Sequence, residues 1–246
     1  MKVVLLGGTK GIGRALGRLL AERGHTLCLL GRSVEALEAS ARDMEVRAGR
    51  DQKVTVAECD LRHPEGFRAA LDSASETLGG FDTVVVTAAL FATQDELEAD
   101  TALARELVTV NFANTIVFCE EARKRLMSSG GGTLCVLSSV AGERGRKPVI
   151  IYGASKAGLS AYLEGLDHKF RAQGLKTICV KPGFVKTGMT AGLDPPPFSG
   201  EPEGVAQVIL KAIERGTPIV YTPGIWRYVM LVIRNLPRFV MRRISF

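Results

Sequence analysis

Short runs of aliphatic and β-branched residues alternate along the chain with longer stretches in which apolar residues recur at helical spacing. Seven of the short runs predict strands, at residues 3–6, 26–30, 53–57, 83–87, 132–137, 176–181 and 218–221. Strands that alternate with helices are typical of βαβ units, in which helices cover both faces of a parallel sheet. The pattern therefore predicts an α/β fold with a doubly wound parallel sheet of about seven strands.

The stretches between these strands predict helices that pack on the sheet. They lie at residues 12–23, 34–49, 64–78, 97–128, 152–173 and 202–215. Gly24 and Gly174 stand where helix C-caps are expected. Residues 193–200 predict an irregular loop, because their consecutive prolines neither continue a helix nor pair in a sheet. We expect one domain, with its body at residues 1–224 and an extension of the same domain at 225–246.

The extension is both apolar and basic, and no acidic residue follows Glu214. Its longest uninterrupted apolar run, residues 228–233, is far shorter than the roughly 20 residues that a membrane-spanning helix needs. Pro237 divides it into two short amphipathic helices. Two interpretations stay open. The extension either lies in a membrane interface, with its arginines near anionic lipid, or packs on the body of the protein or in an oligomer contact.

Composition and charge narrow the class of protein. The chain has 246 residues, is 46% hydrophobic and carries a formal net charge of +6. Acids and bases are interleaved up to residue 214 without a basic stripe, so we expect no nucleic-acid partner. The five cysteines are odd in number and widely spaced, which indicates reduced core residues and neither a disulfide frame nor a metal site. With no signal peptide ahead of the first strand, we expect a cytoplasmic protein.

The first chemical signal directly follows the first predicted strand, in the sequence Gly-Gly-Thr-Lys-Gly-Ile-Gly at residues 7–13. Gly7, Gly11 and Gly13 let the backbone turn tightly and approach a pyrophosphate. The positions between them hold Thr9, Lys10 and Ile12. The N-terminus of the helix that follows is directed at the same anion. A strand, this turn and a helix favour a Rossmann-type dinucleotide site over a purely structural turn.

Residues after the second and third strands bear on the kind of dinucleotide. A NAD-specific site carries an acid at the end of the second strand, where it binds the ribose 2′-hydroxyl. Arg32 stands there instead and, with Lys10, offers positive charge to a 2′-phosphate. NADP(H) is therefore favoured, NAD(H) is the alternative, and the plainest interpretation is two ordinary surface cations. Asp60, followed by Leu61, is placed to accept a hydrogen bond from the adenine amino group, although such an Asp also serves in turns and helix caps.

A set of proton-transfer residues begins at the end of the fifth strand. Ser139 ends that strand, and Tyr152 and Lys156 follow at i and i+4 on one face of the next helix. A nearby ammonium stabilises a phenolate, so Lys156 is expected to lower the pKa of Tyr152. At this edge of the sheet Ser139 is placed to hydrogen-bond a substrate carbonyl, while Tyr152 supplies a proton and a nicotinamide delivers hydride.

Together these residues resemble the short-chain dehydrogenase/reductase family over nearly the whole chain. Further matches are Asp60 at the adenine position, Asn111 at the family's catalytic asparagine, and a Pro-Gly-x-Val-x-Thr segment with Pro182, Val185 and Thr187. The resemblance implies that the tyrosine is the general acid or base and that the lysine binds the nicotinamide ribose and lowers the pKa of the tyrosine. It also implies that the serine orients the carbonyl, that the asparagine holds a water in the proton relay, and that Thr187 contacts the nicotinamide carboxamide.

One segment departs from the family pattern. The usual Asn-Asn-Ala-Gly turn after the fourth strand is replaced by Thr-Ala-Ala-Leu at residues 87–90. This leaves the backbone of Ala88 to contact the adenosine ribose. The resemblance also implies a homodimer or homotetramer.

Family membership leaves the substrate open, because specificity resides in loops grafted onto the shared fold. Residues 140–147 and the extension are similar to the reductase component of the decaprenylphosphoryl-ribose 2′-epimerase system, which implies a keto-sugar carried on a polyprenyl phosphate. The alternatives are a soluble or acyl-type ketone, with the extension as a lid, and a non-catalytic NADP(H)-sensing protein. We expect an NADPH-dependent enzyme that interconverts a ketone and a secondary alcohol, in the cytoplasm or at the inner face of the membrane.

Overall fold

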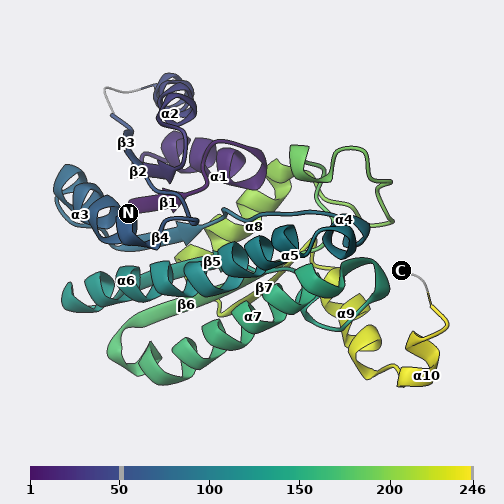
Figure 1. Ribbon diagram of the computed structural model, residues 1–246. Helices are drawn as coiled ribbons and strands as arrows, with labels where there is room; N and C mark the ends of the chain where they lie inside the picture. The colour runs from purple at the N-terminus through teal and green to yellow at the C-terminus, as the bar shows by residue number, and fades with distance from the viewer. Residues whose placement is uncertain (50–52, 245–246) are drawn as a thin grey trace.

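Seven parallel strands form the sheet of the computed structural model, which describes residues 1–49 and 53–244 (Figure 1). The strands lie in the order β3-β2-β1-β4-β5-β6-β7. Their bounds are β1 Lys2–Leu6, β2 Thr26–Gly31, β3 Thr55–Glu58, β4 Thr83–Val86, β5 Gly132–Leu137, β6 Leu175–Pro182 and β7 Ile219–Thr222. Each lies within about two residues of its predicted place. The predicted doubly wound α/β fold is therefore confirmed.

A hydrophobic core lies on each face of the sheet, because successive residues of a strand point to opposite sides. Val3 and Leu5 of β1 belong to the core beneath α1 (Gly11–Glu22), α2 (Val34–Ala48) and α8 (Pro202–Arg215). Val4 and Leu6 belong to the core beneath α3 (Phe67–Leu78), α6 (Thr115–Ser128) and α7 (Ile150–Phe170). Since both faces are covered, the central strands β1 and β4 are apolar after their first residue.

The helix predicted over residues 97–128 is interrupted in the structure. A short helix, α4 (Gln94–Ala99), ends before Asp100, whose carboxylate accepts from the backbone N–H groups of Ala102 and Leu103 and starts α5 (Thr101–Val108). A π-helical turn, Thr109–Asn114, then joins α5 to α6. The prediction missed both features because apolar periodicity continues through a cap and through a π-turn.

The run from Thr101 to Ser128, 28 residues, is long and apolar enough to cross a membrane by length and composition alone. A third of its most apolar window, 33%, is buried inside this fold. Its buried side chains include Phe118, Cys119 and Leu126, which pack in the core shared with α7. The same length and composition are found in the core helices of soluble proteins.

The chain ends in two further helices, α9 (Trp226–Asn235) and α10 (Arg238–Met241). Pro237 separates them, as predicted, and is the residue immediately before α10. Both helices project beside the carboxyl-terminal ends of the strands, at the lower right of Figure 1. Residues 193–200 form an irregular loop, again as predicted. The loop closes at Gly200, which pairs with Val185 in an isolated bridge.

Candidate active site

The strand order reverses between β1 and β4, which lie side by side in the sheet. In doubly wound folds, ligands bind at the carboxyl ends of the strands at such a switch point. Gly7 follows β1 there with a φ of +98°, and a Cβ on it would lie 2.6 Å from the backbone nitrogen of Ala88. A Cβ on Gly13 would overlap the carbonyl oxygen of Gly7. Both positions therefore require glycine, as the glycine-loop interpretation expects.

Thr87, directly after the neighbouring strand β4, holds this loop in place through hydrogen bonds. Its hydroxyl lies 3.1 Å from the carbonyl oxygens of both Leu6 and Gly7, to which it donates. The backbone nitrogen of Ala88 also donates to Leu6, at 3.2 Å. Sequence reasoning noted only that residues 87–90 depart from the family turn. The structure shows that a threonine hydroxyl holds the end of β4 to the end of β1.

The N-terminus of α1 suits an anion. The side chain of its N-cap residue, Lys10, caps no backbone N–H group. The first turn of α1, all of which the structure describes, contains no acidic residue. By contrast α2 is capped by the hydroxyl of Ser33 and α5 by Asp100. The first N–H groups of α1 are thus left to bind a pyrophosphate. This uncapped helix end and the two obligatory glycines fit a dinucleotide.

The segment after β6 lies against the same loop. A Cβ on Gly11 would lie 3.2 Å from the side-chain methyl group of Thr187. Pro182 is the last residue of β6, and Val185 is buried beside the Gly200 bridge. Thr187 accepts from the backbone N–H of Met189 at 3.2 Å. The structure therefore places Thr187, the residue expected to contact the nicotinamide carboxamide, against the glycine loop.

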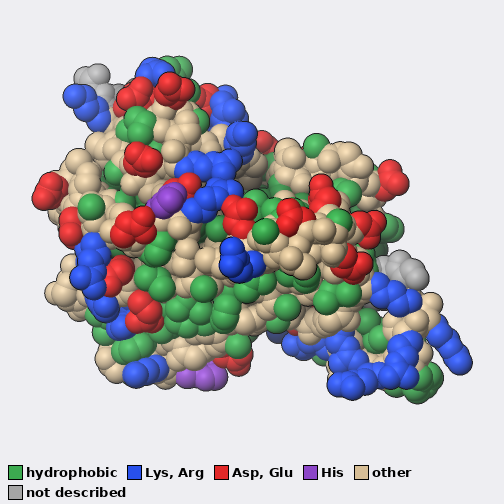
Figure 2. All heavy atoms as spheres, viewed as in Figure 1, with side chains coloured by type: hydrophobic (Ala, Val, Ile, Leu, Met, Phe, Trp, Pro, Cys, Tyr) green, Lys and Arg blue, Asp and Glu red, His purple; other side chains and the backbone are tan. Residues whose placement is uncertain are grey.

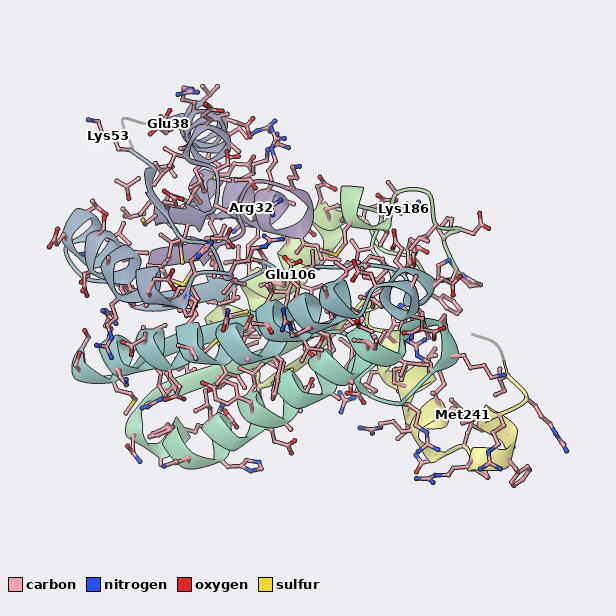
Figure 3. The ribbon with its side chains drawn as sticks, viewed as in Figure 1. Arg32, Glu38, Lys53, Glu106, Lys186 and Met241 are labelled. Carbon is pink, nitrogen blue, oxygen red and sulfur yellow. The ribbon has the colours of Figure 1, made fainter. Side chains whose placement is uncertain are left out.

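Arg32 occupies the two-residue turn between β2 and α2 and is exposed (Figure 3). Lys10 is also exposed, at the start of α1. The turn places Arg32 at the carboxyl end of β2, where the second ribose of a dinucleotide is expected. Arg32 and Lys10 are therefore both open to solvent, and the preference for NADP(H) stays a prediction.

Asp60 follows β3 and forms an Asx turn, with its Oδ1 accepting from the backbone N–H of Arg62 at 2.9 Å. Arg62 in turn pairs with Glu106 of α5 at 2.5 Å. Leu61 is buried, and its carbonyl oxygen accepts from the side chain of Asn114. The turn role foreseen for Asp60 is present, and the same turn places the residue at the strand-end edge expected for adenine.

The three proton-transfer residues converge at the ends of β5 and α7. Ser139 follows β5; its hydroxyl donates to the carbonyl oxygen of Pro182 at 3.5 Å and lies near enough to Tyr152 to lower the pKa of the phenol. The Lys156 ammonium lies 5.8 Å from the centre of the Tyr152 ring and donates to the carbonyl oxygen of Leu137 at 3.0 Å. Ser138 was not singled out from the sequence, yet its hydroxyl donates to the backbone carbonyl of Lys156 at 2.9 Å. That bond fixes the strand end against the helix that carries both other residues.

Burial sets the pKa values of this set. It raises the pKa of Tyr152 to about 12, while the Ser139 hydroxyl lowers it, and it lowers the pKa of Lys156 to about 8. The sequence predicted that Lys156 would lower the pKa of Tyr152. In the structure, desolvation of the partly buried phenol outweighs any such effect, and the ammonium of the buried Lys156 is directed to Leu137. Burial therefore disfavours the ionised form of the Tyr152 phenol.

Asn111 lies in the π-helical turn and is 1% exposed. Its side chain is clamped to the backbone of Leu90, accepting from the N–H and donating to the carbonyl oxygen, each at 2.7 Å. The family resemblance implied that this asparagine holds a water. Here both polar atoms of the side chain hold the segment after β4. The adjacent Phe91 packs edge-on against the Tyr152 ring, with centroids 5.3 Å apart, a contact the sequence did not indicate.

The extension packs on the segment between Ser139 and Tyr152. Trp226, Met230 and Ile233 of α9 form a small hydrophobic cluster with Val140. The guanidinium of Arg144 donates to the carbonyl oxygen of Leu236 at 3.0 Å, and the Lys147 ammonium donates to that of Arg242 at 2.8 Å. The packing interpretation of the extension is therefore correct for one face of α9.

A buried ion cluster joins the same segment to β6 and α9. The Glu143 carboxylate, whose side chain is 4% exposed, pairs with Lys181 through one oxygen and with Arg234 through the other. Lys181 lies directly before Pro182.

The five cysteines are all buried and free, with the pKa of Cys59 raised to about 12 by burial. Among residues 1–49 and 53–244, no group of three or more His, Cys, Asp or Glu side chains is placed to hold a metal ion.

Comparisons with known proteins agree with this arrangement. The model of the short chain dehydrogenase family matches residues 1–196. An uncharacterized oxidoreductase of Mycobacterium tuberculosis is 32% identical over 98% of this chain and 96% of its own length. Carbonyl reductase family member 4 of Xenopus tropicalis is 28% identical over 85% of this chain and 89% of its own. The solved structure of a short-chain type dehydrogenase/reductase from Mycobacterium ulcerans superposes with a TM-score of 0.82, covering 99% of this chain and 98% of that one at 18% identity.

Members of this family are oxidoreductases that bind a nicotinamide dinucleotide, and the uncapped α1 with its glycine loop is where this chain would hold one. The family match covers the glycine loop, Ser139, Tyr152 and Lys156 alike. The chain thus belongs to the short-chain dehydrogenase/reductase family.

Proposed function

We propose that this protein is an NADPH-dependent reductase that converts a ketone to a secondary alcohol, with Tyr152 as the proton donor. The observation that carries the proposal is that Ser139, Tyr152 and Lys156 lie together at the end of β5, at the same edge of the sheet as the loop of Gly7. The reverse reaction uses the same residues with the proton moving the other way.

In the proposed reaction, Ser139, Tyr152 and Lys156 have different roles. The bound nicotinamide supplies hydride to the carbonyl carbon. The hydroxyl of Ser139 and the phenol of Tyr152 hold the carbonyl oxygen, and Tyr152 gives that oxygen its proton. The phenol is protonated at neutral pH, as any phenol of ordinary pKa is, and burial raises its pKa further, to about 12. Lys156 has donors left beyond its bond to Leu137, and these suit the nicotinamide ribose and the phenolate that proton transfer leaves.

A preference for NADP(H) over NAD(H) is supported by the charge at the end of β2. Arg32 is exposed there, and the position where a NAD site carries an acid holds none. An arginine pairs with a phosphate through two parallel hydrogen bonds, so a 2′-phosphate is the better partner.

A second candidate substrate class is a ketone carried on a lipid, such as a keto-sugar linked to a polyprenyl phosphate. It is favoured by the apolar and basic extension, which packs on residues 140–147 between Ser139 and Tyr152. A non-catalytic NADP(H) sensor is less well supported, because a sensor needs no buried lysine beside a protonated phenol.

We also propose a homodimer or homotetramer in the cytoplasm. Val108 and Val117, along α5 and α6, are exposed, and apolar side chains gather between α6 and α7 in Figure 2. An exposed apolar face of this kind suits a second copy of the chain. Five buried, free thiols suit a reducing compartment.

The test is an NADPH-oxidation assay across keto-sugar lipids, acyl ketones and polycyclic ketones, with the Tyr152→Phe variant alongside. Loss of the phenolic proton should lower kcat by about 10²–10⁴-fold while NADPH still binds. Tyr162→Phe is the matched control, because Tyr162 is on the same helix and donates to Glu120 at 2.8 Å, away from Ser139. Unchanged turnover in Tyr152→Phe contradicts the proposed mechanism.

A further inference from the structure

Helix α9 is apolar on two opposite faces. Trp226, Met230 and Ile233 recur at helical spacing and pack inward on Val140. On the outward face Tyr228 is 66% exposed, Leu231 52% and Val232 63%. Phe239 of α10 is 61% exposed nearby in the chain. An exposed apolar face of this size on a helix is normally covered, so the outward face calls for a partner.

The charges around that face are all of one sign. Arg227, Arg238, Arg242 and Arg243 are exposed, and within the described part of the chain none of the four makes an ion pair. Arg234, by contrast, is engaged with Glu143. Figure 2 shows Lys and Arg side chains gathered over α9 and α10, whereas acidic side chains lie over α4. The partner must therefore combine an apolar surface with negative charge.

A second copy of this chain fits these charges poorly. A two-fold symmetric contact through α9 would set the arginines of one copy against those of the other, which is repulsive. An anionic bilayer surface satisfies both features, because apolar side chains enter the acyl boundary while arginines meet the headgroups. We infer that the outward face of α9 and α10, residues 225–243, binds the surface of an anionic membrane.

The binding is peripheral and independent of turnover. The inward face of α9 stays packed on Val140, so docking requires no unfolding of the extension. Val140 belongs to the segment that links Ser139 to Tyr152, so α9 lies between a docked bilayer and the catalytic segment. Membrane binding itself needs no substrate.

The test is flotation of the full chain with vesicles of phosphatidylcholine alone or with added phosphatidylglycerol. Binding should require the anionic lipid and weaken as salt is raised. Each arginine near an anionic surface changes the partition coefficient about fivefold, so R238Q/R242Q/R243Q should weaken binding about 100-fold. The L231S/V232S variant should bind vesicles more weakly than the wild type at every salt concentration, because it loses apolar contact with the acyl chains and no charge.

The charge-matched control is R23Q/R42Q/R215Q, which removes three exposed arginines from the body of the protein. It should bind as the wild type does. Equal binding to neutral vesicles, or an equal loss in this control, overturns the inference. So does self-association without vesicles that disappears in L231S/V232S, which assigns the face to a second copy. Vesicle binding is measured without substrate, so its outcome is independent of the proposed reductase activity.

Discussion

The guanidinium of Arg234, on α9, lies 3.2 Å from the Glu143 carboxylate, four residues beyond Ser139. Lys181, at the end of β6, pairs with the other oxygen of the same carboxylate. The extension thus completes an ion cluster that ties the catalytic segment to the sheet. Charge of this kind is tolerated away from water only when each group is paired.

Among the groups of this cluster, the Glu143 carboxylate should therefore be the one whose removal lowers the free energy of unfolding most. Glu143→Gln leaves the Lys181 ammonium without its partner, and Lys181 is 9% exposed. Breaking such a buried pair lowers the free energy of unfolding by about 3–5 kcal/mol. Arg234→Met removes a half-exposed cation while Lys181 remains, so its cost should be about 1 kcal/mol. Urea denaturation measures both.

The pair Lys186–Glu201, 2.6 Å apart with both side chains more than half exposed, provides the control. Lys186→Met should change stability by less than about 1 kcal/mol, because solvent screens that pair. A Glu143→Gln cost no larger than this would show that the cluster adds nothing to stability.

Any side chain at position 183 should destabilise the protein, because Trp226 packs against Gly183. A Cβ at Gly183 would overlap the indole nitrogen, which donates to the carbonyl oxygen of Phe198 at 3.2 Å. Gly183→Ala must displace the indole or the backbone, so it should cost about 1–3 kcal/mol. In a Trp226→Leu background the same substitution should cost less than about 1 kcal/mol, as chemical denaturation of the double-mutant cycle would show.

Gly204→Ala is the control for that cycle, since a Cβ on Gly204, in α8, meets no atom within 4 Å. It should be neutral or stabilise the protein by up to about 1 kcal/mol, because alanine favours helix. If Gly183→Ala costs the same with and without the indole, Trp226 is not what constrains the site.

Local patterns predicted much of this molecule from the sequence. Apolar runs placed the seven strands, and the Gly7–Gly13 spacing placed the cradle, because a strand, its turn and the next helix are contiguous in the chain. Tyr152 and Lys156 were found because i and i+4 share a helix face. Ser139 was found because it follows β5 at the carboxyl edge of a parallel sheet.

Contacts between distant segments were not predictable in this way. The Asn111–Leu90 clamp, the Thr87 bonds to the end of β1 and the Phe91–Tyr152 contact all join segments that meet only after folding. The direction of the Tyr152 pKa shift also depends on burial, which no i, i+4 spacing reveals. The extension left two interpretations because both faces of α9 are apolar, and only the fold shows which face packs inward.

The buried Lys156 should make the cofactor-free protein less stable at neutral than at alkaline pH. Its pKa falls from 10.5 to about 8 on burial. Between these values the unfolded chain binds a proton that the folded protein lacks, so this contribution to stability rises with pH through that window. Lys156→Met should therefore be more stabilising at pH 7 than at pH 10 by about 2–3 kcal/mol, since each pKa unit is worth about 1.4 kcal/mol. Urea denaturation at both pH values measures the difference.

Lys211→Met, on the exposed face of α8, is the control for that experiment. It should alter stability equally at the two pH values, because its side chain loses no solvent on folding. An effect of Lys156→Met that does not change with pH would mean that the buried amine keeps its charge at alkaline pH.

Cofactor choice should depend on Arg32, the exposed cation between β2 and α2. Arg32→Asp replaces an attraction for a 2′-phosphate with a repulsion and supplies the carboxylate that binds a ribose 2′-hydroxyl. The ratio of kcat/KM for NADPH to that for NADH should fall about 100-fold, which corresponds to about 2.7 kcal/mol. Arg42→Asp, on an exposed turn of α2 beside Glu38, makes the same charge change away from the strand end and should leave the ratio within about threefold. Equal use of both cofactors by the wild type, or an equal fall in Arg42→Asp, would show that Arg32 does not read the phosphate.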